Sequence, residues 1–291
     1  MTVMRVFVAC TPAERLAMRV LEFSIRETSS LPVEVIAIHE RARPIPQPRE
    51  VRNRPRTPFS FQRFLIPELC GFDGRAIYLD ADMQVFADIA GLWNAPMQGH
   101  DLLTVREGNG GRRGQFSVML LDCARLQWRV EDIVAGLDAG RYGYEQLMGE
   151  MCVARSIGRT LAPEWNSLEA YAAGRTCLLH YTNMVTQPWV SLENPLRGLW
   201  VDCLRRALAA GSIAREELQS AVDQGHVRPS LLREVDEANA PLAQLRARDQ
   251  GFRAPYKDLV SGRASPWSAS PAAALGLAKR ALQRLAYLTH R

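Results

Sequence analysis

The apolar positions of the first forty residues follow two different periods. Residues 4–10 (MRVFVAC) and 32–38 (PVEVIAI) are short apolar runs rich in β-branched side chains, which is typical of buried strands. Between them, Thr11 and Pro12 suit the start of a helix. The apolar stripe of this helix consists of Leu16, Val20, Leu21 and Phe23. A strand, a helix and a strand in this order predict a right-handed βαβ unit and a mostly parallel sheet.

The same alternation continues along the chain. Further strands are predicted within residues 74–86 (GRAIYLDADMQVF), 101–105, 115–122 and 176–181. Helices are predicted over 57–69, 126–140, 144–155 and 201–240, with Thr57 as the cap of the first, Pro58 as its first helical residue, and Gly140 ending the second. The pattern therefore indicates an α/β fold with a mostly parallel central sheet flanked by helices.

Two segments interrupt this pattern as loops. Residues 40–58 (ERARPIPQPREVRNRPRTP) are rich in proline and arginine, and residues 106–114 (REGNGGRRG) are rich in glycine and arginine. Loops as long as the first one are uncommon inside a domain unless they serve as lids or binding segments. We therefore expect residues 40–58 to contribute to function.

Charge divides the chain into two parts. The whole chain holds 36 basic and 31 acidic residues, a net charge of +5, yet residues 241–291 alone carry nine basic and two acidic residues. We predict a catalytic domain over 1–240 and a basic extension over 241–291 that ends in an amphipathic helix. This helix either lies on an anionic membrane surface, where it would meet a lipid-linked acceptor, or docks on the domain with its charges in water.

Composition also excludes several classes of protein. The chain has no recognisable nucleic-acid-binding module. Its six cysteines form no CxxC pair, which argues against a zinc ribbon or a thioredoxin-like site and fits reduced thiols in a cytosol. No apolar run approaches the ~20 residues of a membrane span, and the apolar part of the first ten residues is too short for a secretion signal. We expect a cytoplasmic protein, with the membrane's inner face as its only membrane contact.

Candidate chemistry lies in the stretch 74–86, where a buried strand runs into Asp80 and Asp82. Alternate residues of a strand share a side but lie ~6.5 Å apart, so the two carboxylates reach one ion only if the chain bends after Asp80. Ligands of open α/β sheets bind beyond the carboxyl ends of strands. Two adjacent carboxylates repel unless a cation lies between them, and oxygen ligands favour Mg²⁺ or Mn²⁺. By itself the Asp-x-Asp pattern is also common in solvated turns.

Several motifs taken together resemble glycosyltransferase family 8, whose members have the GT-A fold. The stretch TPFSFQRFLIPELCGFDGRAIYLDADMQVFADIAGLW is similar to the arginine-bearing helix and Asp-x-Asp strand of that family. The segments FSVMLLDCARLQW, LAPEWNSLEAY and LLHYTNMVTQPW are similar to later family motifs and occur in the same order. The opening RVFVACTPAERLAMRVLEFSIRETSSLPVEV resembles the nucleotide-binding βαβ unit of the family. The resemblance covers about residues 3–200.

The resemblance implies a role for each matching residue. Asp80 and Asp82, with Ala81 between them, and His180 would hold a divalent metal, Mn²⁺ or Mg²⁺. Arg63 would contact the diphosphate or the sugar of the donor. Without the resemblance, His180 is more simply explained as a hydrogen-bonded core or surface histidine. The remaining residues implied at the donor site are Cys10 and Thr11 at the nucleotide base, and Trp165 and Asn166 along the pocket, with packing as the alternative for the tryptophan.

Two departures from the family pattern change what can be expected. In HYTNMVTQPW, Asn183 stands where glycine is usual, Gln187 replaces a lysine, and one residue is added, so a charge that would bind diphosphate is missing. An arginine of 40–58 or 106–114 would have to replace it. The Asp-Gln-Asp segment of the family becomes YEQLM, which places Glu145 or Gln146 near the sugar, depending on register. Glu145 is then the candidate nucleophile, and the alternative is a solvated acid on a helix.

The implied activity is a retaining, metal-assisted transfer of a sugar from a nucleotide-sugar, with uracil as the expected base, to a glycan or lipid-linked acceptor. The altered lysine and Asp-Gln-Asp positions keep one alternative open, a sugar or nucleotide binder that has lost catalysis. A phosphatase of the haloacid-dehalogenase type also uses Asp-x-Asp, but it needs threonine or valine where this chain has Gln84. Its motif also lies in the first strand, so we set that class aside.

Overall fold

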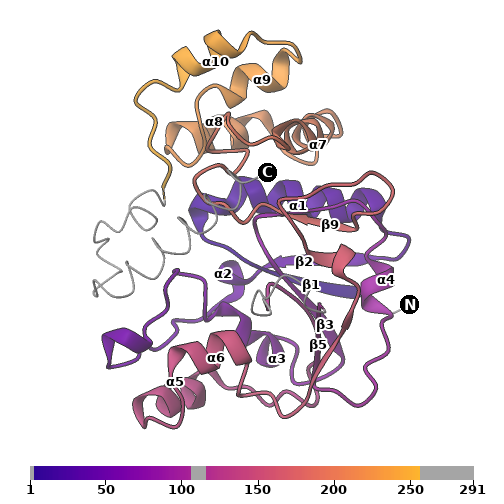
Figure 1. Cartoon of the computed structure of the whole chain (residues 1–291), viewed down its shortest axis with the longest axis vertical. Coiled ribbons are helices and arrows are strands. Elements are labelled where there is room, and N and C mark those ends of the chain that lie inside the picture. Colours follow the sequence, from indigo (N-terminus) through magenta and orange to yellow (C-terminus); the bar gives the residue numbers. More distant parts are fainter. Residues whose placement is uncertain (1–2, 106–115, 256–291) are drawn as a thin grey trace, which may run out of the picture. The chain divides into compact units, whose positions relative to one another are not determined.

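The structure is a computed structural model that describes residues 3–105 and 116–255. The chain divides into two compact units (Figure 1). The first holds residues 1–12 and 24–180, and the second holds residues 13–23 and 181–291. The basic C-terminal helix predicted near residue 291 and the arginine-rich loop 106–114 lie outside the described residues. Among the described residues, none of the helices combines the length and the apolar character that a membrane crossing requires.

A six-stranded sheet forms the centre of the first unit, in the order β2-β1-β3-β6-β5-β7. Its strands are β1 (Met4–Ala9), β2 (Val33–Ala37), β3 (Arg75–Asp80), β5 (Leu102–Val105), β6 (Val118–Asp122) and β7 (Ile157–Leu161). β1 pairs in parallel with β2 and β3, and β5 with β7, whereas β6 runs antiparallel to both β3 and β5. Three of the five neighbouring pairs are therefore parallel, as predicted.

A second, three-stranded sheet lies in the same unit, in the order β4-β9-β8. It consists of β4 (Met83–Val85), β8 (Ser167–Leu168) and β9 (Leu178–His180). β4 follows β3 after only two residues, so the chain passes from one sheet to the other at Ala81 and Asp82. This passage is the bend that the spacing of the two aspartates requires.

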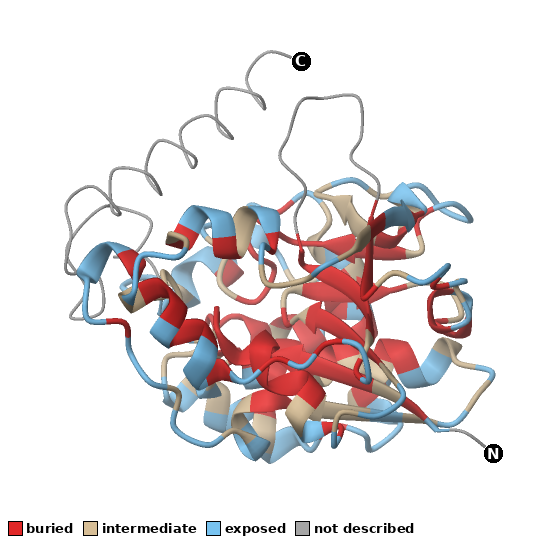
Figure 2. Ribbon diagram, turned by 90° about the horizontal axis from the view of Figure 1, so that it is seen from below, coloured by how far each residue is buried: buried red, intermediate tan, exposed pale blue. Residues whose placement is uncertain are grey.

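Within the first unit, helical segments flank these strands. Figure 2 shows the strands of the central sheet as mostly buried and the helices with exposed residues on their outer sides. In the first unit the helical segments are α2 (Ile38–Arg41), η2 (Val51–Asn53), η3 (Gln62–Leu65), α3 (Ile66–Leu69), α4 (Ala90–Trp93), α5 (Val130–Asp138), α6 (Tyr144–Glu150) and η4 (Pro163–Asn166). In α1 (Arg15–Thr28), which follows η1 (Pro12–Glu14), the predicted stripe residues Leu16, Val20 and Leu21 are buried.

The second unit is helical in its described part. Its helices are α7 (Arg197–Ala209), α8 (Arg215–Asp223), α9 (Leu231–Asp236) and α10 (Leu242–Arg248), together with residues 13–23 of η1 and α1. The expected helical region 201–240 is therefore three helices joined by turns. Gly211 and Gly225 adopt positive φ in two of these turns, a conformation that glycine tolerates without strain.

One predicted helix, 57–69, is shorter than expected. Residues from Thr57 to Phe61 form turns, and the helix then runs as the 3₁₀ segment η3 followed by α3. Pro67 explains why residues 62–65 are 3₁₀ rather than α-helical, because it has no N–H to donate to the carbonyl of Arg63 and its ring crowds that carbonyl. Thr57 still makes a local contact, in which its hydroxyl lies 2.7 Å from that of Ser60.

One face of the central sheet packs against η3, α3, α5 and α6. The buried strand residues of this core alternate along each strand, as the two-residue period requires: Phe7 and Ala9 on β1, Ala76 and Tyr78 on β3, Met119 and Leu121 on β6. Phe64, Leu65 and Ile66 pack against them from the helical side. Tyr78 and Asp80 therefore share the face of β3 that η3 covers, and Asp80 is at its carboxyl end.

Candidate metal and donor site

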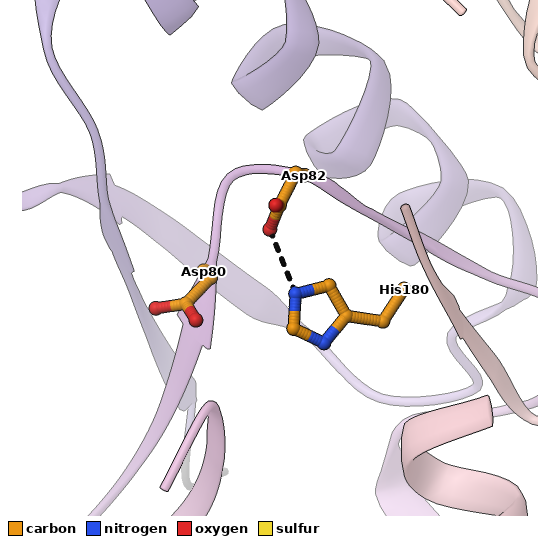
Figure 3. A group of neighbouring side chains, drawn as sticks. All are labelled: Asp80, Asp82 and His180. Atoms are coloured by element: carbon orange, nitrogen blue, oxygen red, sulfur yellow. Dashed lines mark ion pairs between the residues drawn. The ribbon is translucent and has the colours of Figure 1, made fainter. Parts of the chain in front are cut away.

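Two strands of different sheets bring the predicted metal ligands together. Asp80 is the last residue of β3, and Asp82 directly precedes β4. β4 runs antiparallel to β9 with Met83 opposite His180, so the histidine lies beside the bend. One ligand-type atom from each of Asp80, Asp82 and His180 lies within 4.8 Å of the others. Figure 3 shows the Asp82 carboxylate facing the imidazole and the Asp80 carboxylate beside them at the end of its strand.

The chemistry of this cluster fits a divalent cation. His180 Nε2 lies 3.0 Å from Asp82 Oδ1, and the imidazole is almost completely buried. Two carboxylates and one imidazole offer oxygen and nitrogen donors, a set that suits Mn²⁺ and Mg²⁺ better than soft metals. Among the described residues, Asp80, Asp82 and His180 form the group of acidic, histidine or cysteine side chains whose ligand atoms lie close enough together to hold one ion.

Tyr78 and Arg63 both interact with the carboxylate of Asp80. The Tyr78 hydroxyl donates a hydrogen bond of 2.5 Å to Asp80 Oδ1, and the Arg63 guanidinium lies 4.6 Å above the Tyr78 ring. Arg63 also donates to the carbonyl of Phe116 at 2.9 Å and approaches Asp80 Oδ1 at 3.7 Å. Its Nε is buried without a hydrogen-bond partner among the described residues. The arginine is therefore adjacent to the group of Asp80, Asp82 and His180, and its contact with a donor stays a prediction.

Burial and charge oppose each other in this cluster. Burial raises the pKa of Asp80, the Arg63 guanidinium lowers it, and the neighbouring Asp82 raises it again, with a net rise. For His180, burial lowers the pKa, but the carboxylates of Asp82 and Asp80 outweigh burial and raise it overall. Burial also holds the pKa of Tyr78 well above its ordinary value, so its hydroxyl remains a donor. Without a cation, the carboxylates thus draw a proton toward the imidazole.

Asn166 completes the surroundings of the imidazole. Its Oδ1 lies 2.9 Å from His180 Nδ1, on the opposite side of the ring from Asp82. The neighbouring Trp165 is buried, and a Cβ placed on Gly91 of α4 would lie 3.4 Å from its ring. Of the two residues predicted along the donor pocket, the asparagine therefore contacts a predicted metal ligand and the tryptophan packs against α4.

Cys10 and Thr11 follow β1 at the same sheet edge as Asp80, since Ala9 pairs with Asp80. The amide side chain of Gln62 holds the backbone of Cys10, accepting from its N–H at 3.2 Å and donating to its carbonyl at 3.0 Å. The Cys10 thiol lies 3.2 Å from Nδ1 of His39 in α2, shortly after β2. Sequence reasoning did not single out His39 or Gln62. The position of His39 just after a strand is a signal that could have indicated it, whereas Gln62 in η3 has no such signal.

Glu145 and Gln146 stand at the start of α6. Glu145 is half exposed and forms an ion pair with Arg56. Gln146 Oε1 accepts a hydrogen bond of 2.9 Å from the N–H of Gly143, which caps the helix. Glu145 is not part of the cluster of Asp80, Asp82 and His180. The Gln146 side chain thus turns back on its own helix, while which of the two residues faces the sugar stays a prediction.

The loop 40–58 is fastened to α5 and α6. Asn53 donates to the carbonyl of Leu137 and accepts from the N–H of Tyr144, and Asp138 accepts from the N–H of Arg49 at 2.8 Å. Arg43 pairs with both Glu68 and Glu131. Most described arginines of this loop already have acidic partners. The loop 40–58 is therefore held against the rest of the first unit at several points along its length.

Gln187, at the altered lysine position, lies in the second unit. It is buried, and its Nε2 donates to the carbonyl of Tyr181 at 3.0 Å. Asn183 accepts from the N–H of Val185 at 3.3 Å. The glutamine thus supports the backbone of the segment that follows His180, a structural role that an amide side chain performs without charge.

Comparison with known proteins agrees with this geometry. Residues 19–142 match the family model described as Glycosyl transferase family 8. The Protein CDI of Arabidopsis thaliana is 40% identical over 88 residues, which make up 29% of this chain and 34% of that protein. The chain thus spans about a third of the length of this curated relative.

Solved structures with a similar fold are glycosyltransferases. The galactosyltransferase LgtC, solved with donor and acceptor sugar analogs, aligns with 75% of this chain and all of its own chain, at 13% identity and a TM-score of 0.52. The apo form of the glycosyltransferase GlyE of Streptococcus pneumoniae TIGR4 aligns with 78% of this chain and 65% of its own, at 17% identity and a TM-score of 0.50. These likenesses and the family match confirm the predicted resemblance and the GT-A-type α/β fold.

Proposed function

We propose that this family 8-like glycosyltransferase transfers a sugar, with retention of its anomeric configuration, from a UDP-linked donor to an acceptor, with the help of a divalent metal. The observation that carries the proposal is the convergence of Asp80, Asp82 and His180 at the carboxyl end of β3 in a GT-A fold. In such sheets this edge is where ligands bind. A sugar-bearing acceptor is supported by LgtC, whose structure contains donor and acceptor sugar analogs.

The proposed roles follow from position. Asp80, Asp82 and His180 would hold Mn²⁺ or Mg²⁺ next to Ala81, and the bound ion would stabilise the negative charge that develops on the leaving nucleoside diphosphate. Arg63 would donate to the diphosphate or the sugar through its unpartnered Nε. Cys10 and Thr11 would contact the uracil from the end of β1.

These residues act by positioning and by charge. The Tyr78 hydroxyl and the Arg63 guanidinium fix Asp80 before any ligand arrives, so little reorganisation is required when the donor binds. For retention, the acceptor attacks either from the face of the departing diphosphate or after a covalent intermediate. Glu145 is the one candidate nucleophile, and its ion pair with Arg56 would have to open for that role.

The test is release of nucleoside diphosphate. The protein is incubated with UDP-, GDP- and TDP-sugars in the presence and absence of Mn²⁺, and free nucleoside diphosphate is measured. We expect slow hydrolysis of UDP-sugars that requires Mn²⁺ and is abolished in Asp82→Ala. Asp122→Asn is the matched control, because Asp122 also ends a strand but accepts only from nearby backbone N–H groups of a turn. Donor binding without release by the wild type would instead favour a binder that has lost catalysis.

A further inference from the structure

The imidazole of His180 has different partners on its two sides. Nε2 faces Asp82 Oδ1 at 3.0 Å, where the proposed metal would sit, and Nδ1 faces Asn166 Oδ1 at 2.9 Å. A neutral imidazole carries its proton on one nitrogen and a lone pair on the other. Only the form with the proton on Nδ1 offers the Nε2 lone pair to an ion beside Asp82.

Asn166 is suited to select that form. A side-chain carbonyl oxygen only accepts hydrogen bonds, so Asn166 Oδ1 can pair with Nδ1 only when Nδ1 carries the proton. Metal-binding histidines commonly donate their second N–H to such an acceptor, which fixes both the tautomer and the ring plane. No other side chain is placed at Nδ1 by the hydrogen bonds described for this ring.

Backbone pairing holds the asparagine in register with the histidine. Asn166 ends η4 and directly precedes β8, in which Ser167 and Leu168 pair with Leu179 and His180 of β9. The N–H of Glu169 donates to the carbonyl of His180 at 3.1 Å, and the N–H of Cys177 donates to the carbonyl of Glu164 at 3.0 Å. The pairing of β8 with β9 therefore fixes the backbone register that sets Asn166 beside His180.

We propose that Asn166 is a positioning residue that keeps His180 in the Nδ1–H tautomer and so makes its Nε2 a metal ligand, rather than a residue that contacts the nucleotide-sugar. The inference rests on the proposed metal site. It assigns a role to an asparagine that stands fourteen positions before the histidine.

The experiment measures metal binding and tautomer separately from catalysis. Mn²⁺ is titrated into the full chain by calorimetry or by electron paramagnetic resonance, for the wild type and for Asn166→Ala, Asn166→Asp and Asn94→Ala. We expect Asn166→Ala to weaken Mn²⁺ binding by about 10- to 100-fold, which is the usual loss for such partners. Asn166→Asp keeps the acceptor oxygen and should bind Mn²⁺ at least as tightly as the wild type. Asn94→Ala changes an exposed asparagine and should have no effect.

Without an ion, the Asp82 carboxylate at 3.0 Å favours a proton on Nε2, so the tautomer is read in protein loaded with diamagnetic Mg²⁺. There the ¹⁵N shifts of His180 should show a protonated Nδ1, and this proton should exchange with water more slowly in the wild type than in Asn166→Ala. If Asn166→Ala binds Mn²⁺ within about twofold of the wild type and its Nδ1 proton exchanges no faster, the inference is overturned while the metal site stands. If Asn166→Asp weakens binding as much as Asn166→Ala, the inference is also wrong. A wild type that binds no Mn²⁺ would remove the metal site itself.

Discussion

Charged side chains are buried in two regions of the molecule, and the two regions satisfy them differently. In the second unit, the fully buried Arg228 donates to the carbonyl of Pro188 and to the hydroxyl of Ser230, and it pairs with Glu234. Glu234 pairs in turn with Arg197 at 2.8 Å, and Asp249 accepts from both the N–H and the hydroxyl of Ser230. Positive and negative groups alternate, and the network is closed.

At the end of β3 two acidic side chains lie next to each other instead. Arg63 approaches Asp80 at 3.7 Å and the His180 imidazole lies 3.0 Å from Asp82, but the two carboxylates remain neighbours and the Nε of Arg63 has no partner among the described residues. A closed network is what a structural role requires, because each buried charge is compensated in place. Two like charges held next to each other in a partly buried cluster indicate instead a site that binds a ligand.

The largest effect on stability should come from opening the closed network. Glu234→Gln leaves the guanidinium of Arg228 buried without its counter-charge, so we expect the free energy of unfolding to fall by about 3–5 kcal/mol. Mn²⁺ affinity should not change. Denaturant unfolding measures the first quantity and calorimetry the second. Glu193→Gln is the control, because its pair with Arg246 is exposed and should be worth at most about 1 kcal/mol. Equal losses for the two variants would contradict the comparison.

Asp80→Asn, at the candidate site, should preserve stability and remove Mn²⁺ binding. Burial raises the pKa of Asp80, so its ionised form is less favourable in the folded chain than in the unfolded one, and removing the charge at neutral pH relieves that cost. We expect metal-free protein that is at least as stable as the wild type in denaturant, together with loss of measurable Mn²⁺ binding. A clear loss of stability would show that Asp80 serves the fold, as Glu234 does.

A smaller effect is expected for Tyr78→Phe. The substitution removes the hydrogen bond that orients Asp80 but leaves the ring under Arg63. Mn²⁺ affinity should fall by about tenfold, as is usual when a partner of a metal ligand is removed. The metal-free protein should lose only about 1 kcal/mol of unfolding free energy. Unchanged Mn²⁺ affinity in calorimetry would mean that the tyrosine contributes to packing alone.

The smallest effect is expected for Glu145→Gln. The Glu145 side chain is half exposed in its ion pair with Arg56, so the free energy of unfolding should change by less than about 1 kcal/mol. Mn²⁺ affinity should equal that of the wild type, and the rate of UDP release should stay within about tenfold. A fall in that rate of several orders of magnitude, with Mn²⁺ binding intact, would instead identify Glu145 as the nucleophile.

Sequence patterns predict the parts of the site that are local. The strand ending at Asp80 and the bend before Asp82 follow from short apolar runs and from spacing, and both are present. His180 lies far along the chain, and only the resemblance to a family connected it with the aspartates. The helix near Arg63 is shorter than its capping signals indicate, and Pro67 removes the α-helical hydrogen bond to the carbonyl of Arg63.

Contacts made by pairing of distant strands could not be predicted from sequence. Asn166 meets His180 because β8 happens to lie next to β9, and no local pattern carries that register. The contacts of loop 40–58 also cannot be predicted from its composition, which is typical of a lid or a binding segment. Its anchoring depends on Asn53, whose partners are supplied by the end of α5 and the start of α6. The number of arginines in the loop does not indicate which acidic residues they pair with.

The crossing of the chain from one sheet to the other at Ala81 has a mechanical consequence. Asp80 ends a strand of the larger sheet, Asp82 directly precedes the smaller sheet, and His180 ends the central strand of the smaller sheet, so a single bound cation would link the two sheets to each other. Such a link forms only in the assembled protein and adds its binding free energy to folding. Amide hydrogens of β4 and β9 should then exchange more slowly in Mn²⁺ than in a chelator.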